Sequence, residues 1–179
     1  MHPWHDIDPG PYPPANWTAV IEIPRGSNVK YELDKRSGLL RVDRVLHSAV
    51  FYPANYGFLP QTLAEDDDPL DVLVLCQEPV APLAIIESRP IGVLAMLDEH
   101  RWDHKILSVA TGDPEYRPLR TIHQLPEHRL AALRRFFLDY QALEDKTVEV
   151  EDFETAEKAQ EVIAAARQRY RQRYLLPGG

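Results

Sequence analysis

The sequence predicts an α+β domain in which short β-strands fill the first two-thirds of the chain and helices fill the last third. In the first part, short apolar runs are separated by Pro and Gly, a pattern typical of small barrels and sandwiches. In the last part, apolar residues recur at intervals of three and four, which is the spacing of a helix face. The length of 179 residues suits one domain with a single core.

Strands are expected wherever apolar residues alternate or cluster between turn residues. The first candidate, Thr18–Ile23, alternates and is rich in β-branched residues. A turn over Asp34–Gly38 joins the next two candidates, and the continuously apolar Val72–Leu75 indicates a buried strand. In chain order, the candidates are Thr18–Ile23, Lys30–Leu33, Leu39–Val45, Val72–Leu75, Ile85–Glu87, Ile91–Met96 and Lys105–Val109.

Two helices are expected near the C-terminal end of the chain. Pro126 and Glu127 open the first, since Pro fits the first turn of a helix, and Thr155 can cap the second. The apolar face of the first helix comprises Leu130, Leu133, Phe136, Phe137, Tyr140 and Leu143. The apolar face of the second comprises Ala156, Ala159, Val162, Ile163, Ala166 and Tyr170.

Residues 1–17 show neither the alternation of a strand nor the three-to-four spacing of a helix, and they are rich in His and Pro. We expect residues 1–17 to form an irregular N-terminal arm and residues 18–176 to form a single domain. His2 and His5 could bind an adventitious metal ion, but disorder of this terminus is the favoured interpretation.

The composition favours a soluble protein that binds cations. The net charge of −8 argues against a nucleic-acid surface. No apolar run approaches the roughly 18 residues of a membrane helix, and the N-terminus lacks a secretory signal pattern. The lone cysteine, Cys76, lies in an apolar run and is expected to be a small buried side chain. Without a disulfide framework, a cytoplasmic location is expected.

An acidic run, Asp66–Asp71, contains four aspartates within six residues. Two carboxylates about 4 Å apart repel each other by ~4 kcal/mol at an effective dielectric constant of ~20. The buried strand that follows the run holds these charges in place, so a cation is expected among them. Hard divalent cations such as Mg²⁺ prefer carboxylate and water oxygens.

The local sequence supports a metal site in this run. Asp66 and Asp68 point to the same face of an extended chain, and Pro69 favours a turn that returns Asp71 toward Asp68. An EF-hand is disfavoured, because Leu70 stands where the third oxygen ligand should be. A solvated acidic loop remains the alternative for the run alone.

Other charged and aromatic residues could join such a site. Asp98, Glu99 and Asp103 are expected in a short polar loop, which by itself could be an ordinary hairpin tip. Individual charges on strand-like segments include Glu22, Lys30, Glu32, Arg44 and Lys105, and each alone suits a solvent-facing position. Together they suit a metal-bound anion, with carboxylates on the metal and Lys or Arg on phosphate. Tyr52, Tyr56 and Tyr140 could reach a ligand with their hydroxyl groups.

The ordered set of segments resembles family I soluble inorganic pyrophosphatases of the bacterial type. The resemblance runs from about Thr18 to Tyr170, and its specificity lies in the shared order and spacing of the segments. These segments are Val20–Pro24, Lys30–Glu32, Val42–Arg44, Phe51–Gly57, Asp66–Asp71, Asp98–Glu99, Asp103 with Lys105, and Phe136–Tyr140.

The resemblance implies a five-stranded, OB-like β-barrel with flanking C-terminal helices, and hydrolysis of diphosphate to two phosphates by a metal-activated water. It implies Mg²⁺, two or more ions per site, and a homohexamer. Asp68 matches the general base. The matching metal-binding residues are Asp66, Asp71, Asp103 and Asp98, with Glu22 and Glu32 nearby. The matching phosphate-binding residues are Lys30, Arg44, Tyr56 and Tyr140, with Lys105 in the same site.

The chain departs from the family pattern mainly on the phosphate side. Gln141 and Glu149 stand where lysines are usual, although Lys146 could compensate. Asp67 replaces a commoner Gly, and Trp102 occupies a loop position that is usually small or polar. The expectation is a working diphosphatase that binds the leaving phosphate more weakly.

Two rival functions remain open. The missing lysine makes a hydrolase of another small phosphate compound plausible. A non-catalytic Ca²⁺-binding or nucleotide-binding module on the same barrel is the alternative of another class. The retained Asp68 favours an enzyme, because a binding module needs no general base.

Overall fold

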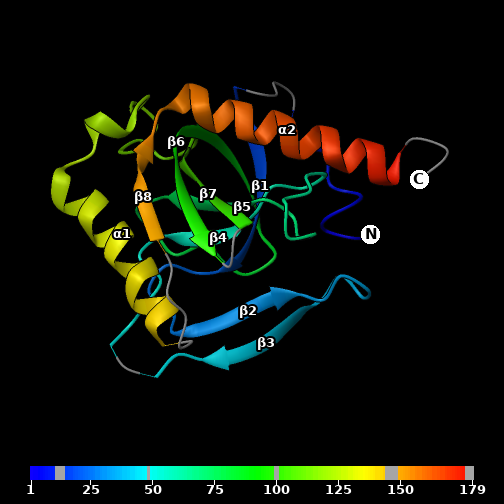
Figure 1. Cartoon of the computed structure of the whole chain (residues 1–179), viewed down its shortest axis with the longest axis horizontal. Coiled ribbons are helices and arrows are strands. Elements are labelled where there is room, and N and C mark those ends of the chain that lie inside the picture. The colour runs from blue at the N-terminus through cyan, green and yellow to red at the C-terminus, as the bar shows by residue number, and fades with distance from the viewer. Residues whose placement is uncertain (11–14, 48, 99–100, 144–148, 176–179) are drawn as a thin grey trace.

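The protein is a β-barrel flanked by two helices, with a separate β-hairpin beneath it, as the computed structural model in Figure 1 shows. The structure describes residues 1–10, 15–47, 49–98, 101–143 and 149–175. The strands are β1 (Trp17–Ile23), β2 (Val29–Leu33), β3 (Leu40–Val45), β4 (Asn55–Phe58), β5 (Asp71–Leu75), β6 (Ile85–Asp98), β7 (Arg101–Ala110) and β8 (Glu149–Glu154). The helices are the 3-10 turn Ile122–Gln124, α1 (Glu127–Ala142) and α2 (Ala156–Tyr174).

Five strands close into the barrel in the order β1-β4-β5-β7-β6, and β1 pairs with β6 to complete the ring. The β5–β7 pair is parallel and the other pairs are antiparallel. Strand β8 extends the sheet beyond β6, while β2 and β3 form their own two-stranded sheet. The predicted five-stranded, OB-like barrel with flanking helices is therefore confirmed.

The structure differs from the predicted strands at two places in the barrel. Strand β4 is not among the predicted strands, but it is a central strand in which Gly57 faces β1 so closely that a Cβ atom would lie 1.9 Å from the Val20 carbonyl oxygen. The two candidates around Pro90 are one strand, β6, whose register shifts between Pro90 and Gly92 to accommodate the proline.

The end of the β6–β7 hairpin also differs from the expected polar loop. Strand β6 continues to Asp98 and β7 begins at Arg101, so Asp103 and Trp102 are strand residues. Glu99 lies outside the described residues. In the hairpin, Met96 pairs with Asp103, which fixes the aspartate in a regular strand instead of a loop.

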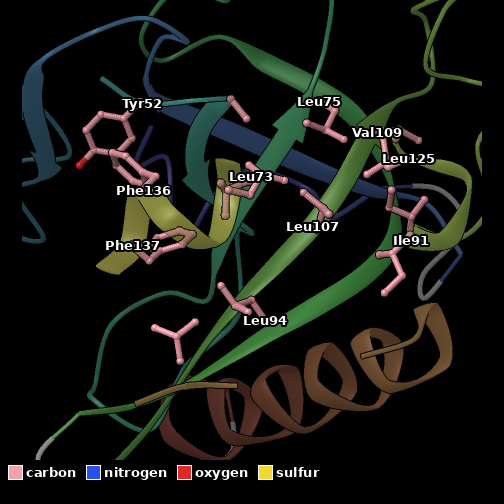
Figure 2. Close-up of a cluster of buried hydrophobic side chains, with 14 of the residues drawn as sticks. Tyr52, Leu73, Leu75, Ile91, Leu94, Leu107, Val109, Leu125, Phe136 and Phe137 are labelled. Atoms are coloured by element: carbon pink, nitrogen blue, oxygen red, sulfur yellow. The ribbon is translucent and has the colours of Figure 1, made fainter. Parts of the chain in front are cut away.

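The barrel strands are buried on both faces because alternate side chains pack into two clusters. On β5 and β7, Leu73 and Leu107 pack with Phe136 and Phe137 of α1 (Figure 2). The intervening residues of the same strands, such as Val72, pack against the small and branched residues of α2. Cys76 is only partly buried, at the edge of that second cluster.

Both helices begin where the sequence predicts. The Thr155 hydroxyl accepts a hydrogen bond from the Lys158 amide at 3.3 Å, which caps α2. The face that α2 buries comprises Ala156, Ala159, Ile163, Ala166 and Tyr170, as expected. Among the described residues, no helix is long and apolar enough to cross a membrane.

The N-terminal segment is irregular, as predicted, but the expectation of a disordered terminus is wrong for residues 1–10. Trp4 is only 2% exposed and packs with Phe58, Leu63 and Tyr170. The His5 ring lies 4.6 Å from the Trp4 ring. Figure 1 shows this segment beside the C-terminal end of α2. Burial of a large aromatic side chain supplies the driving force for this order.

Candidate active site

One cavity of about 530 Å³ lies between the barrel, the β2–β3 hairpin and α1. Charged side chains and tyrosines of both the barrel and the hairpin face it, so it suits a small charged ligand. These lining residues are Glu22, Lys30, Tyr31, Glu32, Lys35, Tyr52, Tyr56, Asp66, Asp68, Asp71, Asp103, Lys105 and Tyr140.

The loop of residues 59–70, the acidic loop, joins β4 to β5 and carries Asp66 and Asp68 to the cavity. The Asp68 amide donates to Asp66 Oδ1 at 3.0 Å, and the Ala64 amide donates to the Asp68 carbonyl at 2.7 Å. The turn therefore spans residues 64–68, and the expected turn over Asp68–Asp71 is wrong because Asp71 already belongs to β5. Asp67 adopts a left-handed backbone with a φ of 68° and does not line the cavity.

A buried lysine connects two aspartates in the floor of the cavity. Parallel pairing of β5 with β7 sets Asp71 opposite Lys105. The Lys105 ammonium bonds to the Asp71 carboxylate and lies 2.9 Å from Asp103 Oδ2. Burial alone would lower the pKa of Lys105, but the carboxylates of Asp103 and Asp71 outweigh it and hold that pKa well above its usual value. Lys105 is therefore charged at neutral pH.

Two acids of the cavity, Asp71 and Glu22, have pKa values above their usual range. Burial, followed by the neighbouring Asp103, raises the pKa of Asp71 to about 6 despite its bonds from Lys105 and Tyr56. Burial and then repulsion from Asp71 raise the pKa of Glu22 to about 8, although Glu22 accepts a hydrogen bond from the Leu33 amide at 2.8 Å. Glu22 is therefore largely protonated at neutral pH unless a cation joins it.

The hairpin supplies the opposite wall of the cavity. Lys30 Nζ lies 2.6 Å from Glu32 Oε1 and 3.4 Å from Asp43 Oδ2, so Lys30 and Glu32 lie on the same face of β2. Lys30 also lies 5.8 Å from the centre of the Tyr140 ring, so α1 and the hairpin meet here. Arg44 binds Asp43 at 2.6 Å but does not line the cavity.

The structure brings together ten of the twelve residues that the sequence assigned to the site. Of the other two, Arg44 is linked to the lining residue Lys30 by two ion pairs that share Asp43, and the Asp98 side chain lies outside the described part of the chain. The lining residues among the twelve are Glu22, Lys30, Glu32, Tyr56, Asp66, Asp68, Asp71, Asp103, Lys105 and Tyr140.

Sequence reasoning missed Lys35, which lies in the turn between β2 and β3. Its ammonium bonds to the Asp68 carboxylate and donates to the Asp67 carbonyl at 3.1 Å. Its position in a predicted turn suggested an exposed side chain, and no local pattern relates it to the acidic loop. The contact arises because the hairpin folds over the cavity.

The donor set fits a hard divalent cation, although the side chains are not arranged around one. In the part of the chain that the structure describes, no three His, Cys, Asp or Glu side chains are placed to hold one ion. Lys105 lies between Asp71 and Asp103 instead, and the three aspartates expected to converge, Asp66, Asp68 and Asp71, line one cavity but do not form such a group. The remaining donors are carboxylate oxygens, and a cation beside Glu22 would oppose the burial and the Asp71 charge that raise the pKa of Glu22.

Comparison with known proteins gives the same picture over nearly the whole chain. Residues 19–171 match the family model described as inorganic pyrophosphatase. Soluble inorganic pyrophosphatase 2 of Chlamydomonas reinhardtii is 54% identical over 174 residues, which cover 97% of this chain and 91% of that protein. A soluble inorganic pyrophosphatase of Solanum tuberosum is 57% identical over 152 residues, covering 85% of this chain and 72% of the other.

The fold comparison agrees with the sequence comparison. The crystal structure of the inorganic pyrophosphatase from Thermus thermophilus superposes with a TM-score of 0.88 at 40% identity, and the match covers 92% of this chain and 97% of the other. With the barrel, the charged cavity and the sequence matches in agreement, the chain belongs to the inorganic pyrophosphatase family.

Proposed function

We propose that the protein hydrolyses inorganic diphosphate to two phosphates in the cavity between the barrel and the hairpin. The observation that carries this proposal is the alternation of lysines and carboxylates around one small cavity, with Lys30 and Lys105 on facing walls. Diphosphate is a compact polyanion that needs cations on both phosphoryl groups. Family membership supports the same substrate.

We propose Mg²⁺ as the cofactor, with two or more ions per site. Asp66, Asp71 and Asp103 would hold it with carboxylate oxygens, and Asp98, Glu22 and Glu32 would support them. Mg²⁺ bound there would lower the pKa of a coordinated water and neutralise charge on the phosphoryl oxygens. Magnesium binding would also require Glu22 to lose its proton, because a protonated carboxyl is a poor ligand.

Asp68 is the proposed general base. Its side chain is 51% exposed at the mouth of the cavity, whereas the Asp71 carboxylate is held by Lys105 in the floor. Water can therefore reach Asp68. The water oxygen forms a bond to one phosphorus while the bridging P–O bond breaks and its electron pair leaves with the second phosphate. The proton of the attacking water passes to Asp68 and then to solvent.

The basic residues and tyrosines bind the phosphoryl groups in this mechanism. Lys30, Lys105 and Arg44 would spread the negative charge that develops on phosphoryl oxygens. Tyr56 and Tyr140 would donate hydroxyl hydrogen bonds. In this mechanism Lys105 would exchange part of its contact with Asp71 and Asp103 for contact with the substrate, while the metal ion would compensate the charge of the two carboxylates.

Gln141 is expected to weaken binding of the leaving phosphate, because a lysine is usual at this position. Its side chain lies outside the described part of the structure. Gln141→Lys should raise kcat/KM for diphosphate several-fold, since one added cation contact is worth roughly 1 kcal/mol or more. Gln141→Met, which gives an unbranched and flexible side chain without charge, is the control. No gain in kcat or kcat/KM with lysine would contradict this account.

We also propose a cytoplasmic homohexamer in which residues 18–176 form the single catalytic domain. The exposed apolar residues Val42, Val45 and Phe51 support self-association, being 55%, 61% and 51% exposed. Light scattering coupled to size exclusion measures the assembly directly. A monomeric mass at micromolar concentration would contradict the hexamer without affecting the proposed chemistry.

The experiment that tests the activity is a phosphate-release assay with Mg²⁺ over diphosphate, triphosphate and nucleotides. We expect diphosphate to be preferred. Excess Ca²⁺ should suppress release, because Ca²⁺ tolerates looser coordination and occupies the site without supporting the reaction. Preferred release from another compound would favour the rival hydrolase, and no release from any compound would favour a binding module.

A further inference from the structure

The acidic loop is closed on itself at Thr62. This residue is fully buried, and its hydroxyl donates to the Leu59 carbonyl at 2.6 Å and accepts from the Leu70 amide at 2.9 Å. The Leu59 amide also donates to the Leu70 carbonyl at 2.9 Å. The two ends of the loop are therefore joined, and the position of Thr62 fixes where the loop leaves the barrel.

The N-terminal segment of residues 2–8, the N-terminal strap, contacts Thr62 and its neighbours from outside the acidic loop. The indole Nε1 of Trp4 donates to the Thr62 carbonyl at 2.8 Å, and the Gln61 amide donates to the Trp4 carbonyl at 2.9 Å. The Gln61 side chain donates to the carbonyls of His5 and Ile7 at 3.3 and 3.2 Å. Gln61 has a left-handed backbone with a φ of 54°, a conformation that costs free energy and that these bonds maintain.

Helix α2 holds the other side of the same segment. The Leu63 amide donates to the Ala166 carbonyl at 2.9 Å, and Arg169 Nε donates to the Leu63 carbonyl at 2.8 Å. His5 of the strap lies 2.7 Å from the Tyr170 hydroxyl, so the strap is itself tied to α2. Residues 61–63 are thus clamped between the strap and the helix.

The strap has a second attachment at the hairpin. A ring nitrogen of His2 lies 3.0 Å from the Lys35 carbonyl, and Lys35 bonds to the Asp68 carboxylate. The strap therefore reaches the proposed base by two routes, through the acidic loop and through the hairpin turn. None of the strap residues lines the cavity.

We propose that the N-terminal strap positions the acidic loop for hydrolysis, with Trp4 as a positioning residue for Asp68. This rests on the proposed function of Asp68 as general base. Trp4 acts through Thr62 and touches neither substrate nor metal. A displacement of the base by even 1 Å can reduce turnover by up to about 100-fold. The strap would therefore affect the chemical step more than substrate binding.

Trp4→Phe tests this proposal, because phenylalanine keeps an aromatic ring in the core but removes the Nε1 donor together with part of the packed indole. We expect kcat to fall about tenfold while KM stays within about twofold. We also expect amide hydrogen exchange at residues 61–68 to speed up about tenfold, with little change in the barrel strands. Asp113→Asn, a destabilising change at a buried aspartate outside the cavity, serves as the control at matched loss of stability.

The possible results distinguish failure of the strap proposal from failure of the proposed function. Unchanged exchange at residues 61–68 together with a kcat within twofold of wild type would overturn the strap proposal. An equal loss of kcat in Asp113→Asn would also overturn it, because the effect would then be general destabilisation. If the wild-type protein released no phosphate, the proposed function would fail, while the exchange experiment would still decide whether Trp4 holds the loop.

Discussion

Two aspartates, the buried Asp113 and the half-buried Asp71, lie near opposite ends of the β5–β7 strand pair and have opposite electrostatic surroundings. Asp113 accepts hydrogen bonds from the Gln77 amide at 2.7 Å, the Gln77 side chain at 2.8 Å and the Glu115 amide at 2.8 Å. Burial alone would raise its pKa, but these donors outweigh burial and hold the pKa of Asp113 well below its usual range. Asp71 has mainly charged neighbours, and its pKa is raised to about 6.

The difference separates a structural acid from a functional one. Asp113 receives backbone and amide donors that are already in place, so it is stable without any ligand. Asp71 shares one lysine with Asp103 in a cavity lined by further carboxylates, so the protein leaves its charge incompletely compensated. We infer that Asp71 is built to meet a cation from solution, whereas Asp113 is built to fasten a loop.

The largest expected effect concerns the proposed base at the functional end. Asp68→Asn should lower kcat by about 10²–10⁴-fold, because an amide cannot take the proton from the attacking water. Asp67→Asn is the matched control, since Asp67 lies next to it but does not line the cavity. Steady-state phosphate release measures both. Turnover of Asp68→Asn within a few-fold of wild type would rule out the assignment of the base.

At the structural end, Asp113→Asn should cost about 1–3 kcal/mol of unfolding free energy while kcat stays near wild type. The cost depends on pH, because the pKa of Asp113 is lower in the folded than in the unfolded protein. The stabilisation is present above the unfolded pKa of about 4 and is lost as pH falls below it. Urea denaturation at pH 7 and pH 3 measures this. An equal gap between the two proteins at both pH values would contradict it.

A smaller effect is expected at Asp67, where the acidic loop needs a left-handed backbone. Asp67→Gly should stabilise the protein by up to about 1 kcal/mol, because glycine adopts positive φ without steric cost. Asp67→Ala removes the same carboxylate but keeps the backbone strain, so it should not stabilise. Thermal unfolding of both variants distinguishes the backbone effect from the charge effect. Equal stability of the two variants would show that charge, and not conformation, matters at this position.

Much of the fold and of the site could be predicted from local patterns and ordered motifs. The helices, the hairpin and most barrel strands follow apolar periodicity. Strand β4 did not, because its assignment depends on the close approach of Gly57 to β1, which is a tertiary contact. Strand β8, with its acidic sequence, was not predicted by its pattern either. It becomes a strand by pairing with β6.

Within the site, too, local patterns and ordered motifs predicted some residues, whereas others depend on tertiary contacts. The acidic run predicted a site for cations, and the resemblance related it to distant residues such as Lys30 and Tyr140. The contact between Lys35 and Asp68 and the bond from Trp4 to Thr62 each join segments that lie far apart in the sequence. Such contacts depend on how the hairpin and the N-terminal segment fold over the barrel, which no local pattern encodes.

The most direct test of the contrast between Asp71, the proposed cation ligand, and Asp113, the structural acid, uses Mg²⁺. It is the effect of Mg²⁺ on thermal unfolding of wild type, Asp71→Asn and Asp113→Asn. A ligand at 100 times its Kd stabilises by about 2.7 kcal/mol, or roughly 5–10 °C for a protein of this size. We predict that wild type and Asp113→Asn show this full shift from different starting temperatures, and that Asp71→Asn shifts by less than about 2 °C. A full shift in Asp71→Asn, or its loss in Asp113→Asn, would contradict the account.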